Sequence, residues 1–235
     1  MSIEELIRQQ AFYHYYQPII DFKSWKRIGN EVLLRSKMFA YPEDAFDVAK
    51  EENKLFELDT YSIEQAIRSH QRTSYNCKRF LLFINVYPST IQNPDFLPFI
   101  EKILSDPSIH HKIVLEINEA EKIDNYSTFK EALETLRAIG ILIAMDDLGM
   151  GHLELQNIIE LKPDFIKLDK YFASGIEGSP EKQRIVELVQ SYCSQFNISL
   201  ILEGIETPVS LATAKSIGIH LGQGFATGRP ELLDD

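Results

Sequence analysis

The sequence predicts an α/β fold in which strands and helices alternate to form one large barrel. The chain has 235 residues, close to the roughly 250 residues that an α/β barrel needs. It contains eight short, nearly continuous apolar segments, as expected for strands covered on both faces of a parallel sheet. Stretches between them have apolar residues three or four positions apart, which is typical of helices. The alternation predicts a mostly parallel sheet in one domain over residues 1–235.

The eight expected strands follow one another along the whole chain. They are residues 13–20, 27–35, 79–86, 112–117, 140–146, 164–168, 198–203 and 218–224. The longest interval between two of them, 36–78, has room for two helices. No linker rich in Gly and Pro divides the chain, which favours a single domain.

Two of the expected helices have clear end signals. The first covers residues 127–140, with Ser127 as N-cap and Gly140 as stop. The second covers residues 180–197, where Pro180 suits the first turn. Its apolar side chains are expected on one face, namely Ile185, Leu188, Val189 and Tyr192.

Composition and charge exclude several classes of function. The net charge of −11 disfavours broad binding to polymeric nucleic acid or to an anionic membrane, since both need a surplus of Lys and Arg. Cys77 and Cys193 are far apart, so neither a disulfide framework nor a zinc site is expected. The N-terminus lacks the features of a signal peptide, and no apolar run approaches the roughly 18 residues of a membrane span. We therefore expect a soluble, cytoplasmic protein.

Polar side chains recur at the C-terminal ends of the expected strands. They are Glu31, Asn85, Glu116, Asp146 with Asp147, Lys167, Glu203 and Gln223. From Asn85 onward the gaps are 31, 30, 21, 36 and 20 residues, about one strand, one helix and two loops each. If the strands close into a barrel, these side chains meet at the rim where barrel enzymes have their active sites. Burying them without partners or metal ions would cost several kcal/mol each.

The chemistry of these side chains predicts a site for two divalent metal ions. Carboxylate and amide oxygens suit Mg²⁺ or Mn²⁺ and not zinc, which favours Cys and His. Asp146 and Asp147 repel each other unless cations lie between them, so Asp146 is expected to bridge two ions and Asp147 to bind the second. Such a pair activates water for attack on a phosphodiester. Lys167 would supply a fixed positive charge beside the reacting oxygen.

Alternative interpretations exist for the same residues. An isolated pair such as Asp146 and Asp147 before a glycine could be a helix cap and turn. Lys167 could be a Schiff-base lysine, as in barrel aldolases, but an amine among carboxylates keeps its proton and is a poor nucleophile. Asp169, two residues further on the same strand face, is a candidate partner for Lys167.

Glu31 and Glu116 have a structural alternative of their own. They could be buried ion-pair partners of Arg35 and Lys112. The recurrence of oxygen donors on successive strands favours metal binding over this alternative.

Eight motifs follow one another along the chain, namely YYQPI (15–19), EVLLR (31–35), INVYPSTI (84–91), LEINE (115–119), MDDLGMG (145–151), PDFIKLD (163–169), LEGIET (202–207) and GQGFATGRP (222–230). Together they resemble the EAL domain, a bacterial family of cyclic di-GMP phosphodiesterases. The resemblance covers almost the whole chain. It implies a modified TIM-type (β/α)8 barrel with one antiparallel strand, metal-dependent hydrolysis of cyclic di-GMP to linear pGpG, and a homodimer formed near the loop after the fifth strand.

The resemblance also implies roles for individual residues. The ligands of one metal would be Glu31, Asn85, Glu116 and Asp146, with Asp146 and Asp147 serving the second. Lys167, Glu203 and Gln223 would act on the catalytic water, and Glu119 would order the loop after the two aspartates. Gln17, Leu33 and Arg35 fall where the family meets the guanine nucleotide.

The chain also departs from the family pattern. Val32 replaces the usual Ala, and Leu148, Met150 and His152 replace residues of the loop beside the two aspartates. GFATGRP lacks an aromatic pair often found after GQG. None of these changes removes a ligand, so they bear on rate and regulation. The alternative function is a catalytically weak or inactive domain that acts as a cyclic di-GMP receptor or as a protein-interaction module.

Overall fold

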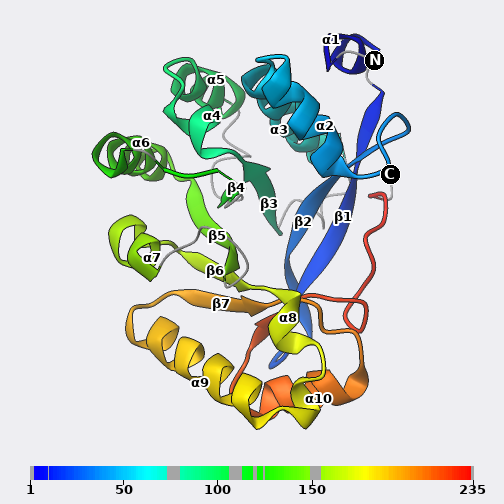
Figure 1. The fold of residues 1–235 in the computed structure, drawn as a ribbon, viewed down its shortest axis with the longest axis vertical. Helices are drawn as coiled ribbons and strands as arrows, with labels where there is room; N and C mark the ends of the chain where they lie inside the picture. The colour runs from blue at the N-terminus through cyan, green and yellow to red at the C-terminus, as the bar shows by residue number, and fades with distance from the viewer. Residues whose placement is uncertain are drawn as a thin grey trace.

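The protein forms a closed barrel of eight strands with helices arranged around its outside (Figure 1). The structure is a computed structural model. It describes residues 3–9, 11–72, 80–105, 113–118, 121–123, 125–148 and 155–233, with the backbone alone at 147 and 155. Within these residues no helix is both long and apolar enough to cross a membrane.

The strands neighbour one another in sequence order around the barrel. They are β1 (Phe12–Asp21), β2 (Lys26–Ser36), β3 (Leu81–Val86), β4 (Ile113–Ile117), β5 (Leu142–Leu148), β6 (Phe165–Leu168), β7 (Ser199–Leu202) and β8 (Leu221–Gly222). All pairs from β2 to β8 are parallel, whereas β1 is antiparallel to both β2 and β8. The eight expected strands and the single antiparallel strand are thus confirmed.

The helices lie between the strands on the outside of the barrel. They are α1 (Ile3–Arg8), α2 (Pro42–Glu51), α3 (Leu55–Arg72), α4 (Pro88–Gln92), α5 (Phe96–Ile103), α6 (Tyr126–Ala138), α7 (Leu155–Leu161), α8 (Lys170–Ala173), the 3-10 helix η2 (Ile176–Gly178), α9 (Pro180–Gln195) and α10 (Pro208–Ser216). The interval 36–78 contains two helices, α2 and α3, as predicted.

The expected N-cap of α6 was wrong by two residues. Asn125 is the N-cap, and its side chain accepts hydrogen bonds from the backbone N–H groups of Ser127 and Thr128. Asn is as good a cap as Ser, and Asn125 has the extended backbone that a cap requires, so the helix starts at Tyr126. The expected stop is confirmed, because Gly140 has a positive φ of 91° directly after the C-cap.

The buried face of α9 also differs from the expectation. Ser179 caps the helix and Pro180 is its first residue. The buried side chains are Val186 and Cys193, whereas Ile185 and Leu188 are 46% and 50% exposed. Residues 186, 189 and 193 form a second apolar stripe at helical spacing, and this stripe faces the barrel. Cys193 is a buried free cysteine, consistent with a packing role.

The barrel interior changes from apolar to polar along the strands. Its apolar layer consists of Ile19, Phe83, Val114, Ala144, Phe165 and Ile201. Because side chains alternate along a strand, the residue two positions further points to the same face. Two positions after the last five of these residues lie Asn85, Glu116, Asp146, Lys167 and Glu203. The polar side chains therefore sit directly above an apolar floor, at the C-terminal rim.

The C-terminal segment completes the barrel beside β1. Strand β8 pairs with β1 only at Ile20 and Asp21. Nearer the N-terminal end of β1, Tyr16 N donates to Glu231 O at 2.7 Å, and Glu231 N donates to Tyr16 O at 3.1 Å. The segment runs along β1 toward its upper end (Figure 1). Residues after β8 are thus held against the strand that carries Gln17.

Candidate active site

Lys167 lies at the centre of a buried acidic cluster. Its side chain is 1% exposed, and it rises from β6 into the barrel rim. Its Nζ lies 2.8 Å from Asp146 Oδ1 and 2.8 Å from Glu203 Oε1. It also lies 3.0 Å from Glu116 Oε1 and 3.2 Å from Glu31 Oε1. Four carboxylates thus share one ammonium group, which has three N–H donors.

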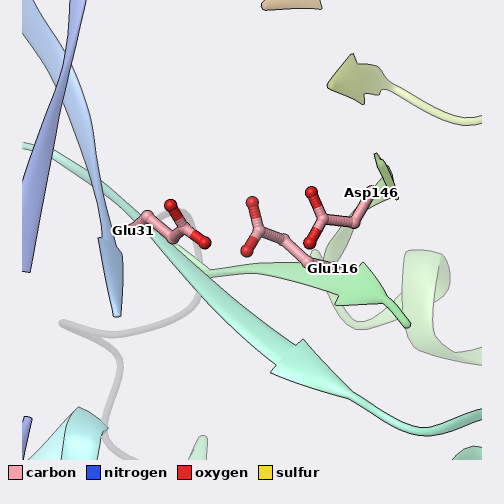
Figure 2. A group of neighbouring side chains, drawn as sticks. All are labelled: Glu31, Glu116 and Asp146. Atoms are coloured by element: carbon pink, nitrogen blue, oxygen red, sulfur yellow. The ribbon is translucent and has the colours of Figure 1, made fainter. Parts of the chain in front are cut away.

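Three of these carboxylates point toward one another from different strands (Figure 2). Glu31, Glu116 and Asp146 each contribute an oxygen, and these oxygens all lie within 4.8 Å of one another. Asn85, from β3, donates its Nδ2 to Glu116 Oε2 at 3.3 Å. The structure therefore brings together Glu31, Asn85, Glu116 and Asp146, the four residues expected to bind one metal ion.

Burial and charge shift the ionisation of the cluster strongly. Burial raises the pKa of Glu116 well above its usual value, although Lys167 opposes this rise. The same balance raises the pKa of Glu203 to about 8. Burial alone would lower the pKa of Lys167, but the surrounding carboxylates outweigh it and raise that pKa well above its usual value. The carboxylates thus favour the protonated form of Lys167, which argues against a Schiff-base role.

The donor set fits divalent cations that prefer oxygen ligands. Glu116 Oε1 and Asp146 Oδ1 are buried and have no hydrogen-bond donor in suitable geometry among the described residues, so their contact with Lys167 is ionic. Four carboxylates against one ammonium also leave an excess of negative charge. Carboxylate oxygens from several strands are the ligands of Mg²⁺ and Mn²⁺. These residues would hold such an ion.

Two glutamines extend the cluster toward β1. Gln223 Nε2 donates to Glu31 Oε2 and, at 3.0 Å, to Gln17 Oε1. Gln17 Nε2 in turn donates to Gly228 O at 3.1 Å. Gln17 and Gln223 are 9% and 3% exposed. The structure therefore joins an expected nucleotide contact, Gln17, to an expected catalytic residue through a direct hydrogen bond.

Close backbone contacts hold the loops that carry Glu203 and Gln223. Ile205 N donates to Gln223 O at 3.0 Å, and Gln223 N donates to Leu202 O at 3.0 Å. A Cβ on Gly224, whose φ is 154°, would lie 2.3 Å from Ile205 O. Only glycine permits this approach. The two loops therefore form one unit that fixes both side chains.

The acidic cluster lies in a cavity of about 740 Å³, within the size range of small-molecule sites. Leu33 and Arg35, both expected at the nucleotide, line it. Arg35 donates to Leu34 O at 2.8 Å and lies over the Tyr15 ring. No ion pair joins Arg35 to Glu31 within the part of the chain that the structure describes. The alternative of an Arg35–Glu31 pair was therefore wrong.

Sequence reasoning missed part of the cavity wall. Phe46, Tyr87 and Phe225 line the cavity, and the Phe46 and Tyr87 rings lie 5.2 Å apart. Tyr87 follows Asn85 by two residues, so the alternation that singled out Asn85 would also have found Tyr87. Phe46 comes from the outer helix α2, and no strand periodicity points to it.

Other expected site residues have different surroundings. Asp169 Oδ1 accepts a hydrogen bond from Tyr171 N at 2.7 Å and caps α8, so it does not pair with Lys167. Leu148 is buried in the core between the barrel and its outer helices. Glu119, Met150, His152 and the side chain of Asp147 lie outside the described residues.

Comparisons with known proteins agree with this architecture. A sequence model of the family described as "EAL domain" matches residues 1–230. The probable cyclic di-GMP phosphodiesterase PdeN of Escherichia coli K12 is 28% identical over 240 residues, which cover 100% of this chain and 46% of PdeN. The blue light- and temperature-regulated antirepressor BluF of the same organism is 29% identical over 154 residues, 65% of this chain and 38% of BluF.

A solved structure shows the same fold. Klebsiella pneumoniae BlrP1, in a complex with manganese and cyclic di-GMP at pH 9.0, superposes with a TM-score of 0.85 at 28% identity. The match covers 94% of this chain and 56% of the BlrP1 chain. The chain thus spans about half the length of these matched proteins. With a family match over nearly all residues and a closed barrel whose first strand is antiparallel, this chain belongs to the EAL domain family.

Proposed function

We propose that this chain is a metal-dependent phosphodiesterase that hydrolyses cyclic di-GMP to linear pGpG. The observation that carries the proposal is the position of Lys167 within 3.2 Å of four carboxylates, at the floor of an open cavity on the barrel rim. The names of relatives support the substrate, since PdeN is a probable cyclic di-GMP phosphodiesterase and BlrP1 was solved with that nucleotide.

The proposed cofactors are two divalent cations, Mg²⁺ or Mn²⁺. Glu31, Asn85, Glu116 and Asp146 would hold the first, and Asp146 would share the second with Asp147. When bound, such ions act as Lewis acids and lower the pKa of water. The family supports this choice, because manganese is present in the BlrP1 complex.

The chain's own residues have distinct proposed roles in the reaction. Lys167 holds a positive charge at the cluster centre and stabilises the negative charge that grows on the phosphoryl oxygens. Glu203, whose side chain is 16% exposed, borders the cavity and would take the proton of the attacking water. Gln223 would accept a hydrogen bond from that water. Glu119 is proposed to order the loop after the two aspartates.

The cavity also supplies the proposed nucleotide contacts. Leu33 offers an apolar surface, and the Arg35 guanidinium would meet a phosphate or the guanine edge. Phe46, Tyr87 and Phe225 add aromatic walls on which a base can stack. A cyclic dinucleotide carries two phosphates and two bases, so it matches a cavity lined by both a guanidinium group and aromatic rings.

Three further points belong to the proposal. The chain would act in the cytoplasm, form a homodimer near the loop after β5, and not bind polymeric nucleic acid, because its net charge is −11. Sedimentation of the purified protein measures the oligomeric state, and a monomer at all concentrations would contradict the dimer.

A hydrolysis assay tests the proposed activity. The purified chain is incubated with cyclic di-GMP and Mn²⁺ or Mg²⁺, with a parallel sample in EDTA, and the products are separated by chromatography. We expect pGpG only in the metal samples. Micromolar binding of cyclic di-GMP without turnover would instead favour the receptor. Absence of both would favour a protein-interaction module, a role consistent with the resemblance to the antirepressor BluF.

A further inference from the structure

We infer that Gln17 is a positioning residue, which fixes the direction of the Gln223 amide and thereby holds Glu31 in the metal-binding cluster. The inference rests on the proposed function, because it assigns Gln17 a task in the same site. It adds this task to the expected contact between Gln17 and the nucleotide.

The hydrogen bonds at the two ends set the direction of both amides. At one end, the backbone carbonyl of Gly228 can only accept, so Gln17 presents its Nε2 there, at 3.1 Å. At the other end, Glu31 Oε2 accepts from Gln223 Nε2. The Gln17 oxygen then faces Gln223 and accepts its second N–H, at 3.0 Å. A flip of either amide would place two oxygens against each other.

This arrangement determines which atom of Gln223 is left for chemistry. Both N–H bonds of its amide are used, one by Glu31 and one by Gln17. Its Oε1 is buried and has no donor within the described ranges, although the residue borders the cavity. A buried acceptor without a donor is costly. We call the hydrogen bonds from Glu31 through Gln223 and Gln17 to Gly228 O the amide relay. The relay leaves the Gln223 oxygen able to accept a hydrogen bond from a reactant, such as water.

The backbone holds the far end of the relay in place. A Cβ on Gly228, whose φ is 154°, would lie 2.3 Å from Pro18 Cγ, so only glycine allows the C-terminal segment to approach β1 this closely. The paired hydrogen bonds between Tyr16 and Glu231 anchor the same segment. The Gln17 side chain thus lies between the Gly228 carbonyl and the acidic cluster, and the residue is 9% exposed.

Gln17 lines the cavity beside Leu33 and Arg35 and is more buried than either. Its oxygen accepts from Gln223 and one of its N–H bonds donates to Gly228 O, so its second N–H can still donate to a nucleotide. Loss of the Gln17 amide should nevertheless disturb Gln223 and Glu31 before any nucleotide binds. The expected consequence is weaker Mn²⁺ binding in the absence of nucleotide.

A double-mutant cycle on metal affinity tests the inference without requiring turnover. The variants are Gln17→Met, Gln223→Met and the double variant, because Met keeps the length of Gln without its amide. Mn²⁺ binding is measured by calorimetry in the absence of nucleotide. We expect each single variant to weaken binding about 10-fold, as for other residues that orient metal ligands. The double variant should also lose about 10-fold, because both substitutions break the same relay.

A matched control separates positioning from general loosening of the fold. Gln183 Nε2 donates to the Ile176 carbonyl at 2.8 Å on α9, outside the cluster. Gln183→Met should lower the melting temperature about as much as Gln17→Met while leaving Mn²⁺ affinity unchanged. Gln17→Asn, which is one methylene too short to reach both ends, serves as a milder second variant and should weaken Mn²⁺ binding as well.

Two results would overturn the inference. One is a double variant whose loss of Mn²⁺ affinity is the product of the single losses. The other is a Gln17→Met protein with wild-type Mn²⁺ affinity and a KM for cyclic di-GMP raised 10-fold or more, which marks a substrate contact. Failure of the proposed function looks different, since a wild-type protein that makes no pGpG still gives a readable Mn²⁺ cycle.

Discussion

Lys167 Nζ lies 2.8 Å from Asp146 Oδ1, deep in a barrel rim where the lysine is 1% exposed. The same ammonium contacts three further carboxylates, which come from β2, β4 and the end of β7. Glu31 and Glu116 are buried, and the nearby ammonium offsets part of the cost of burying them. The pair therefore links stability to the chemistry proposed for the site.

Replacing Lys167 by Met should destabilise the metal-free protein and abolish hydrolysis. Removing one partner of a buried ion pair costs about 3–5 kcal/mol, and here the carboxylates lose their shared cation. Thermal unfolding with and without Mn²⁺ measures the effect, and Mn²⁺ should restore part of the lost stability. Lys130→Met is the control, because its 2.8 Å pair with Glu160 is about 40% exposed and worth less than about 1 kcal/mol. Equal stability of wild type and Lys167→Met would contradict the account.

Gly224→Ala should impair the site through its backbone. The new Cβ would lie 2.3 Å from Ile205 O, so the two loops that carry Glu203 and Gln223 would separate. We expect a lower melting temperature and a loss of turnover of about 10-fold or more. Gly178→Ala is the matched control, because a Cβ there meets nothing within 4 Å. The explanation fails if both alanine variants behave alike.

His14 should make stability depend on pH in acid. Burial lowers its pKa to about 4 from 6.5, and its Nε2 lies 2.9 Å from Ser62 Oγ. Between pH 6.5 and 4, His14 binds a proton in the unfolded chain but not in the folded protein. The folded state is therefore destabilised relative to the unfolded state as the pH falls. At about 1.4 kcal/mol per pH unit the loss is roughly 3 kcal/mol.

Urea unfolding of wild type and His14→Phe at several pH values checks this contribution. The unfolding free energy of His14→Phe should rise relative to that of the wild type as the pH falls from 6.5 to 4. His220→Gln is the control, because that histidine is more exposed and its effect should be smaller. A constant difference between wild type and His14→Phe over this range would show that His14 titrates normally.

Asp59 should have the opposite pH dependence. This acid on α3 is 1% exposed and accepts a hydrogen bond from Tyr87 N at 2.9 Å, two residues after Asn85. Burial raises its pKa to about 7 from 3.8. The folded state therefore holds a proton that the unfolded state releases, and this contribution to stability is lost as the pH rises from 4 to 7.

Asp59→Asn keeps an acceptor for Tyr87 N but cannot ionise. Its unfolding free energy should therefore rise relative to wild type as the pH increases from 4 to 7, by roughly 4 kcal/mol at most. Denaturant titrations at pH 4, 5.5 and 7 measure the difference. A variant that is less stable than wild type by the same amount at every pH would mean that Asp59 is ionised throughout.

The sequence predicted the barrel and the acidic cluster for a clear physical reason. Side chains alternate along a strand, so a polar residue at the end of each apolar run must enter the barrel rim. Glu116 and Lys167 illustrate this, since each follows an apolar interior residue by two positions. The buried face of α9 could not be predicted in the same way. Ile185 and Val186 lie on overlapping apolar stripes, and only the packing of the helix against the barrel determines which of them is buried.

Contacts between distant segments could not be predicted from the sequence. The bond between Gln17 and Gln223 joins residues 206 positions apart, and the carbonyl of Gly228 that orients it belongs to a segment with no periodic pattern. Asp59 is similar, because it lies on a helix whose periodicity predicts packing and not a hydrogen bond with Tyr87 N. Such residues need the closed barrel before their partners are defined.

Asp146→Asn beside wild type is the measurement that tests the central claim most directly. The substitution keeps the shape of the side chain and removes the charge that is proposed to bridge two cations. The control is Asp21→Asn, because Asp21 ends β1 at the opposite end of the barrel and accepts a hydrogen bond from Lys23 N in the following turn. With Mn²⁺ and cyclic di-GMP, wild type and this control should both form pGpG. Asp146→Asn should form none above the EDTA background and should bind Mn²⁺ at least 10-fold more weakly. Equal pGpG formation by Asp146→Asn and wild type would contradict a metal-dependent site at Asp146.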